Sequence, residues 1–278
     1  MKGFSLQRFG RTAFTVFSSD LQAGLIRPAF SSILLVLMLV FAPGCAWLES
    51  GGPARQQEVQ ARMDLCKSYL QNQKPRKGLK ELLAIEDRAA GNPEFHFLMG
   101  LVQMQLKDFP KAADAFQKAV ELDPDYGQAW NNLGRTLIEQ EKYIEAENAL
   151  QRALAVPTYL TPEYPAYNLA RMFEKQGREA LSLEYAQLAL EHSEGFAPAV
   201  LLLAEGRLEQ GRIEEAVAVL HKGLAQNPNN SQLMLALAEN YLRLGDNRHA
   251  KKWFQRILDL VPASAEAQVA KDYLDILP

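Results

Sequence analysis

The sequence predicts an all-α protein built as a solenoid of helical hairpins. Ala, Leu, Glu and Gln are abundant, whereas Thr and Ile are scarce beyond residue 50, a balance that favours helix over sheet. From about residue 59 the chain repeats with a period of 34 residues, and apolar residues recur at helical spacing on two segments of each period. The chain has 278 residues, of which 48% are hydrophobic, and this composition is typical of a folded protein.

The first 44 residues have the features of a secretory signal. Lys2, Arg8, Arg11 and Arg27 oppose the single acid Asp20. An unbroken apolar run over residues 33–42 follows, and it is too short for the roughly 20 residues that span a bilayer. A basic region, a short apolar core and small residues after it are the order of a signal peptide. We therefore expect residues 1–44 to be a signal peptide of the lipoprotein type.

Cys45 directly follows the small residues of this segment, Ala42, Pro43 and Gly44. This arrangement resembles the lipobox of bacterial lipoproteins. The resemblance implies cleavage before Cys45, lipid on its sulfur and new amino end, and a position on the periplasmic face of the outer membrane. Residues 45–58 would then form a flexible, lipid-anchored tether. The alternatives are an uncleaved anchor, or a plain signal peptide with an incidental cysteine.

The repeat is clearest in residues 93–126. This copy has Gly100 at its eighth position, Ala112 at its twentieth, Phe116 at its twenty-fourth, Ala119 at its twenty-seventh and Pro124 at its thirty-second. Later copies carry related residues at these positions: Gly134, Ala146, Leu150 and Ala153; Ala204, Ala216, Leu220, Gly223 and Pro228; and Ala238, Ala250, Phe254 and Pro262. Small residues at positions eight and twenty predict that paired helices approach closely.

Each copy predicts two short helices. Leu233, Leu237 and Leu244 share one helical face of the last copy, and Phe254 and Leu258 share another after a break at 245–247. The six copies are 59–92, 93–126, 127–162, 163–196, 197–230 and 231–264. The third copy is two residues over the period, and residues 265–278 predict a helix that caps the array. Cys66 is expected to be a small buried side chain.

These residues and this period look like the tetratricopeptide repeat, or TPR. The resemblance implies a right-handed superhelix of about six helix-turn-helix repeats with a concave inner surface. In this family the first helix of each repeat lines that surface. The candidate partner-binding residues at the lining positions are Phe97, Leu101, Asn131, Arg135, Tyr164, Tyr167, Arg171, Leu201 and Glu205. The alternative is that neighbouring helices already cover these side chains.

Several functional classes are disfavoured. The sequence contains no HExxH, CxxC, Walker loop or GxSxG motif, and its four histidines have no ligand spacing between any two of them. We therefore predict no enzyme, no catalytic residue, no metal, no cofactor and no small-molecule substrate. The net charge of −3 offers no basic field for nucleic acid. A protein partner is the remaining expectation.

The middle of the array narrows this expectation. Trp130, Asn131 and Asn132 open the third copy, and Pro157 and Tyr159 lie in its insertion. Together with six repeats behind a lipobox, this pattern resembles the type IV pilus biogenesis and stability lipoproteins. The resemblance implies that the chain binds the outer-membrane secretin subunit and helps it assemble or reach its membrane. The alternatives are a general periplasmic TPR adaptor for another envelope-assembly or cell-wall complex, and an accessory subunit of an enzyme.

Overall fold

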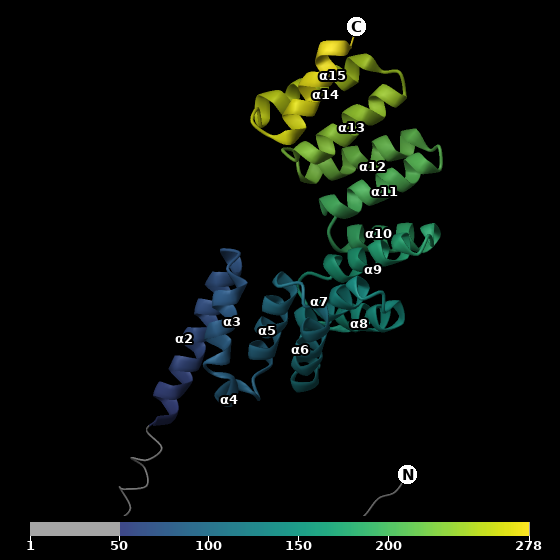
Figure 1. Cartoon of the computed structure of the whole chain (residues 1–278). Coiled ribbons are helices and arrows are strands. Elements are labelled where there is room, and N and C mark those ends of the chain that lie inside the picture. The colour runs from purple at the N-terminus through teal and green to yellow at the C-terminus, as the bar shows by residue number, and fades with distance from the viewer. Residues whose placement is uncertain (1–50, 278) are drawn as a thin grey trace, which may run out of the picture. The chain divides into compact units, whose positions relative to one another are not determined.

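A computed structural model describes residues 51–277, and all regular structure in this range is helical (Figure 1). The helices are α2 (Gly51–Gln71), α3 (Pro75–Leu83), α4 (Glu86–Ala89), α5 (Pro93–Gln105), α6 (Phe109–Leu122), α7 (Gly127–Glu139), α8 (Tyr143–Ala155), α9 (Glu163–Lys175), α10 (Glu179–His192), α11 (Ala197–Glu209), α12 (Ile213–Gln226), α13 (Ser231–Arg243), α14 (Asn247–Leu260) and α15 (Ala265–Ile276). The predicted all-α solenoid is confirmed.

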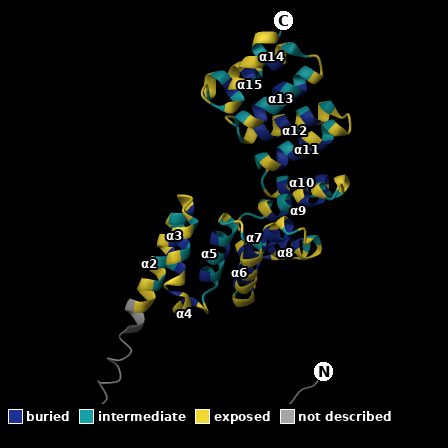
Figure 2. Cartoon of the chain, in the orientation of Figure 1, coloured by how far each residue is buried: buried dark blue, intermediate teal, exposed yellow. Residues whose placement is uncertain are grey.

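The helices from α5 to α14 form consecutive hairpins. The pairs α5 and α6, α7 and α8, α9 and α10, α11 and α12, and α13 and α14 pack together, and the second helix of each pair also contacts the next hairpin. The first helices begin at residues 93, 127, 163, 197 and 231, and α15 begins at 265 and packs on α14. Buried residues gather where consecutive helices face each other (Figure 2). Each hairpin therefore needs its neighbours to bury its apolar faces.

Local sequence explains where many helices begin. The Asn92 side chain accepts hydrogen bonds from the backbone N–H groups of Glu94 and Phe95, and Pro93 occupies the first turn of α5. Asp108, Asn230, Asp246 and Ser264 cap α6, α13, α14 and α15 in the same way. These side chains satisfy N–H groups that have no partner within the helix, and proline fits the first turn because its ring replaces one of them.

The turn inside each hairpin uses one residue in the left-handed region. Gly177, Gly211 and Gly245 adopt φ values of 69°, 73° and 75° in the last three hairpins. At the equivalent turns after α2, α5 and α7, the residues Gln73, Lys107 and Glu141 adopt φ values of 54°, 61° and 59°. A residue with a Cβ atom pays about 1–2 kcal/mol for this conformation, whereas glycine does not.

Replacing Glu141 with glycine is expected to raise the free energy of unfolding by about 0.5–1 kcal/mol, because relief of backbone strain exceeds the extra freedom that glycine gives the unfolded chain. Gly211→Ala is the converse control. The space around Gly211 is open, so the loss of about 1 kcal/mol expected there reports backbone strain alone. Urea denaturation measures both, and a less stable Glu141→Gly protein would contradict this account of the turns.

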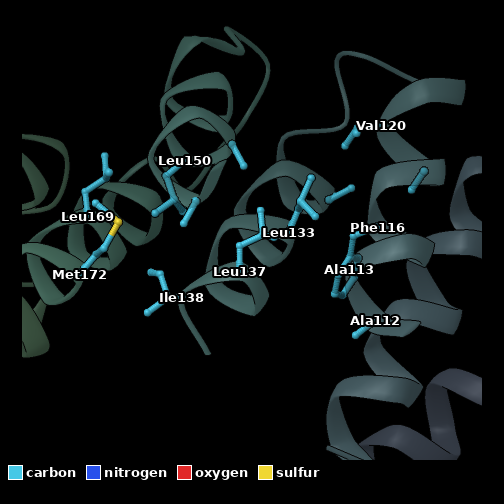
Figure 3. Packing of buried hydrophobic residues seen from close by; sticks show 14 of the residues in the cluster. Ala112, Ala113, Phe116, Val120, Leu133, Leu137, Ile138, Leu150, Leu169 and Met172 are labelled. Atoms are coloured by element: carbon cyan, nitrogen blue, oxygen red, sulfur yellow. The ribbon is translucent and has the colours of Figure 1, made fainter. Parts of the chain in front are cut away.

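Glycine brings the two helices of a hairpin close together, as two positions illustrate. A Cβ atom on Gly100 would lie 2.5 Å from the Phe116 ring, and one on Gly134 would lie 2.5 Å from Cγ of Leu150. In Figure 3, Leu133 of α7 lies between Phe116 of α6 and Leu150 of α8, and all three side chains are buried. The close approach predicted from the small residues at the eighth position is therefore present, and a large apolar side chain fills the space beside each glycine.

The two-residue insertion of the third copy is anchored by an aromatic ring. Tyr159 is only 9% exposed, and a Cβ atom on Gly127 would lie 2.6 Å from its Cγ atom. The ring packs with Val156 and Trp130, whose indole N–H donates to the carbonyl of Pro124 at 2.8 Å. The next residue, Leu160, is 92% exposed. The insertion therefore buries one side chain and presents its neighbour to solvent.

The structure differs from the sequence expectation at the start of the array. Residues 51–58 were expected to belong to a flexible tether, but α2 begins at Gly51 and includes them. Residues 54–58, Ala-Arg-Gln-Gln-Glu, have high helix propensity, and Pro53 lies in the first turn, where proline is tolerated. An ion pair of 2.7 Å between Glu58 and Arg88 links the early part of α2 to α4. The predicted signal peptide, Cys45 and residues 46–50 lie outside the described residues.

One further expectation concerns Cys66, and one further finding concerns the length of the helices. Cys66 is fully buried, and this burial raises the pKa of its thiol to about 11, so the expected role as a small core side chain is confirmed. Among residues 51–277, none of the helices has the length and apolar character needed to cross a bilayer.

Candidate partner-binding site

The predicted partner-binding residues fall into two groups along the array. The first group lies between α5 and α7, where Leu101 and Arg135 line a hollow of about 270 Å³ together with Leu70, Met104 and Gln105. The Gln105 side chain donates to the carbonyl of Leu70 at 3.1 Å, and the Arg135 guanidinium lies 3.6 Å from the sulfur of Met104. Desolvation lowers the pKa of Arg135, which stays charged at neutral pH. This hollow is mainly apolar, with one cation at its edge.

Two residues expected at this surface serve packing instead. Phe97 is half-buried, and its ring lies 5.8 Å from that of Phe116 and 5.0 Å from that of Tyr126. Asn131 is only 8% exposed, and its side-chain oxygen accepts a hydrogen bond of 2.8 Å from Asn168 of the next repeat. The alternative reading, that neighbouring helices cover the lining positions, therefore holds for these two side chains.

The second group is brought together between α9 and α11. Tyr167, Arg171, Leu201 and Glu205 line one hollow of about 300 Å³, which we call the inner hollow. The remaining lining residues are Pro198, Leu202 and Gln232. Four residues predicted from repeat positions alone thus share one site, although they come from two helices separated by α10 in the chain. The site offers an aromatic ring, an apolar floor and charges of both signs, which is a composition suited to a protein segment.

Aromatic contacts fix the position of the Tyr167 ring. The ring of Phe196, the residue before α11, lies 5.5 Å from that of Tyr167 and 5.1 Å from that of Tyr164 in edge-on geometry. Tyr164 is 47% exposed, so it is available at the margin of this cluster. Sequence reasoning missed Phe196. Tyr126 holds the equivalent last position of the second repeat, and its ring packs against Phe97 in a tilted geometry. The aromatic residue at the last position of both repeats is the sequence signal that could have indicated Phe196.

Charge and burial set the chemistry of the inner hollow. The Arg171 guanidinium forms an ion pair of 2.5 Å with Glu174 one turn later on α9. Burial raises the pKa of the Tyr167 phenol, while Arg171 lowers it by a smaller amount. The phenol is therefore protonated at neutral pH and can donate a hydrogen bond to a ligand.

A second hollow, missed by the sequence analysis, adjoins the first. We call it the acidic hollow, and its volume is also about 300 Å³. It is lined by Glu174, Gly177, Glu179, Ser182, Leu183, Leu202, Glu205, Gly206 and Glu209. Leu202 and Glu205 line both hollows, so the two adjoin. Within residues 51–277, no group of three or more His, Cys, Asp or Glu side chains is placed to hold a metal ion.

Known proteins share the repeat. Family models described as tetratricopeptide repeat match residues 93–126, 115–148 and 207–271. A CTR9 homolog from Arabidopsis thaliana is 26% identical over 220 residues, which are 76% of this chain and 20% of that protein. A DnaJ homolog subfamily C member 7 homolog from Dictyostelium discoideum is 22% identical over 196 residues, 66% of this chain and 36% of that protein. This chain therefore spans only a minor part of these relatives.

Two solved structures share the fold over almost their whole length. PilW, described as a widely conserved type IV pilus biogenesis factor, superposes with a TM-score of 0.62 at 23% identity, covering 76% of this chain and 97% of PilW. PilF of Pseudomonas aeruginosa superposes with a TM-score of 0.63 at 20% identity, covering 79% of this chain and 99% of PilF. At these identities the likeness establishes the fold. The chain therefore contains tetratricopeptide repeats and has the right-handed superhelical fold that PilW and PilF share.

Proposed function

We propose that this chain is a non-catalytic, lipid-anchored scaffold that assists type IV pilus biogenesis by binding the outer-membrane secretin and helping it to assemble or reach its membrane. The observation that carries the proposal is the inner hollow, where Tyr167, Arg171 and Leu201 gather on one open surface. Tyrosine and arginine dominate the binding energy of many protein interfaces. The fold shared with PilW, a type IV pilus biogenesis factor, supports pilus biogenesis as the setting. The secretin is the partner that the resemblance of the third copy to the pilus lipoproteins implies.

Lipid at Cys45 would confine this surface to the membrane. Helix α2 begins at Gly51, so only residues 46–50 separate Cys45 from the array. A chain of this length spans at most roughly 20 Å when fully extended. A partner held in the inner hollow would be confined to the membrane plane together with the anchored chain, which raises its effective concentration there.

Deletion of the gene is expected to reduce the amount of secretin ring that survives on an unboiled gel, and Cys45→Ser is expected to do the same by releasing the protein from the membrane fraction. Cys66→Ala is the control, because it removes the other cysteine and leaves Cys45 in place. Wild-type amounts of ring in the deletion strain would overturn the secretin assignment. A Cys45→Ser protein that stays in the membrane fraction would overturn the lipid anchor.

The double variant Tyr167→Ala and Arg171→Ala is expected to weaken capture of the secretin by about tenfold or more, because it removes both the aromatic ring and the cation of the inner hollow. Circular dichroism should be unchanged. Arg152→Ala is the matched control, since this exposed arginine lies on α8 and does not line the hollow. Equal capture by the double variant would place the secretin elsewhere on the array. A crosslinked pull-down in which another envelope protein replaces the secretin would favour the general adaptor.

A further inference from the structure

We infer that the acidic hollow accepts a lysine or arginine side chain of the protein segment that occupies the inner hollow. The inference deepens the proposed function, since it rests on this surface binding a protein, and it names the chemistry of the bound segment. The observations that carry it are two carboxylates without an ion-pair partner, the unpaired hydroxyl of a residue that is only 3% exposed, and the lining residues that the two hollows share.

The acidic hollow has more negative charge than its own cations neutralise. Glu205 and Glu209 stand four residues apart on α11, so they share one helical face, and neither forms an ion pair or hydrogen bond with a described residue. Glu174 is paired with Arg171, and Glu179 accepts a hydrogen bond of 2.9 Å from Gln210. Two carboxylates without an ion-pair partner therefore line a concave site, and Arg171, which lines the adjoining inner hollow, is already paired with Glu174, so the site favours a positively charged ligand.

Ser182 supplies an independent observation. Ser182 is only 3% exposed and lines the acidic hollow, yet its hydroxyl makes no hydrogen bond with a described residue. The equivalent positions of four other repeats hold Ala112, Ala146, Ala216 and Ala250, all fully buried. The fold thus works with alanine at this position, and the Ser182 hydroxyl is left as an unpaired donor and acceptor in the lining of the hollow. A hydrogen-bond donor of a ligand could pair with it.

The arrangement suits an organic cation better than a metal ion. A metal ion needs several ligands converging at short distance, and the carboxylates of this hollow do not form such a group. A guanidinium or ammonium group instead spreads directional N–H donors over several acceptors. Glu205, Glu209 and the Ser182 hydroxyl are acceptors of that kind on facing helices, α11 and α10.

The inner hollow specifies what stands beside the cation. Because the two hollows share Leu202 and Glu205, an extended segment can fill both at once. Alternate residues of an extended chain lie about 7 Å apart and on the same side. The segment is therefore expected to carry an apolar residue, in contact with Tyr167 and Leu201, two positions from its lysine or arginine.

The test uses the purified full chain in detergent and a fluorescein-labelled peptide, Gly-Leu-Gly-Arg-Gly-Leu-Gly, measured by fluorescence anisotropy. A second peptide replaces arginine with citrulline, which has nearly the same shape and no charge. Wild-type protein is expected to bind the arginine peptide at least about tenfold more tightly, because charge-assisted hydrogen bonds are lost with citrulline. Raising the salt concentration should narrow this difference. Equal affinity for the two peptides would overturn the inference.

Variants locate the effect. Glu205→Gln with Glu209→Gln should abolish the preference for arginine, while Glu184→Gln with Glu191→Gln should retain it, because these exposed glutamates of α10 line neither hollow. Ser182→Ala should weaken binding of the arginine peptide by about twofold or more without lowering the melting temperature, since alanine fits this position elsewhere. A preference retained by the Glu205 and Glu209 variant would overturn the inference.

The same experiments separate this inference from the proposed function. If wild-type protein prefers the arginine peptide but secretin rings form normally without the gene, the acidic hollow stands and the secretin assignment fails. If ring formation needs the gene but the wild-type protein binds both peptides equally, the secretin assignment stands and the inference fails.

Discussion

Phe116→Ala is expected to lower the free energy of unfolding by about 3–5 kcal/mol, which is the usual loss for a fully buried phenylalanine. The ring belongs to a cluster that joins α6 to α7, and it also fills the space left by the missing side chain of Gly100. Truncation therefore leaves a cavity at the junction of the second and third repeats. Urea denaturation followed by circular dichroism measures the loss.

Leu160→Ala is the matched control for this truncation. Leu160 is 92% exposed at the tip of the insertion, so its removal should change the free energy of unfolding by less than about 0.5 kcal/mol. A similar loss for Phe116→Ala and Leu160→Ala would show that the core of the array lies elsewhere. A small loss for Phe116→Ala alone would show that the neighbouring helices collapse into the cavity.

Gly134→Val is expected to cost about 2–3 kcal/mol through overpacking. A Cβ atom at this position would lie 2.5 Å from Cγ of Leu150 and 3.2 Å from the backbone oxygen of Ala146, so α7 and α8 would have to separate. The branched methyl groups of valine enlarge the clash. Thermal and urea denaturation should both report the loss.

Two companion variants identify the cause. Gly91→Val places the same side chain where no atom lies within 4 Å, and it should stay within about 0.5 kcal/mol of the parent protein. Leu150→Ala in the Gly134→Val background should recover part of the loss, because it removes the clashing group. Strict additivity of the Gly134 and Leu150 substitutions would contradict direct contact between them.

The repeating part of the fold was predictable because each hairpin is specified locally. Gly134 and Leu150 recur at fixed positions of a 34-residue period, and that spacing alone indicates which residues of the two helices meet. The left-handed residue at each turn could be inferred only where it is glycine, as at Gly177. At Glu141 the surrounding helices impose the conformation, and the amino-acid type gives no indication of it.

The beginning of the array was harder to predict, because local signals there compete. Gly51, Gly52 and Pro53 favour a turn or linker, yet the residues after them favour helix, and the helix prevails with a surface ion pair between Glu58 and Arg88 beside it. That ion pair joins residues 30 positions apart. Neither propensity nor periodicity contains this information.

The inner hollow was partly predictable and the acidic hollow was not. Repeat positions identified Tyr167, Arg171 and Leu201, because lining positions are fixed by the helical period. The same rule included Asn131, which the structure shows to be buried by its bond to Asn168. Ser182 occupies a repeat position that holds alanine in four other copies, so its position in the period gives no indication of a cavity. Its place in a cavity depends on how far apart two consecutive repeats stand.

Contacts that join only adjacent hairpins have a mechanical consequence. Among the described helices the extensive contacts join neighbouring hairpins, so small rotations at successive junctions can add up without breaking any single interface. Such an array can extend elastically along its axis when a force is applied to it. A client undergoing assembly could then shift its position while the grip on it is maintained.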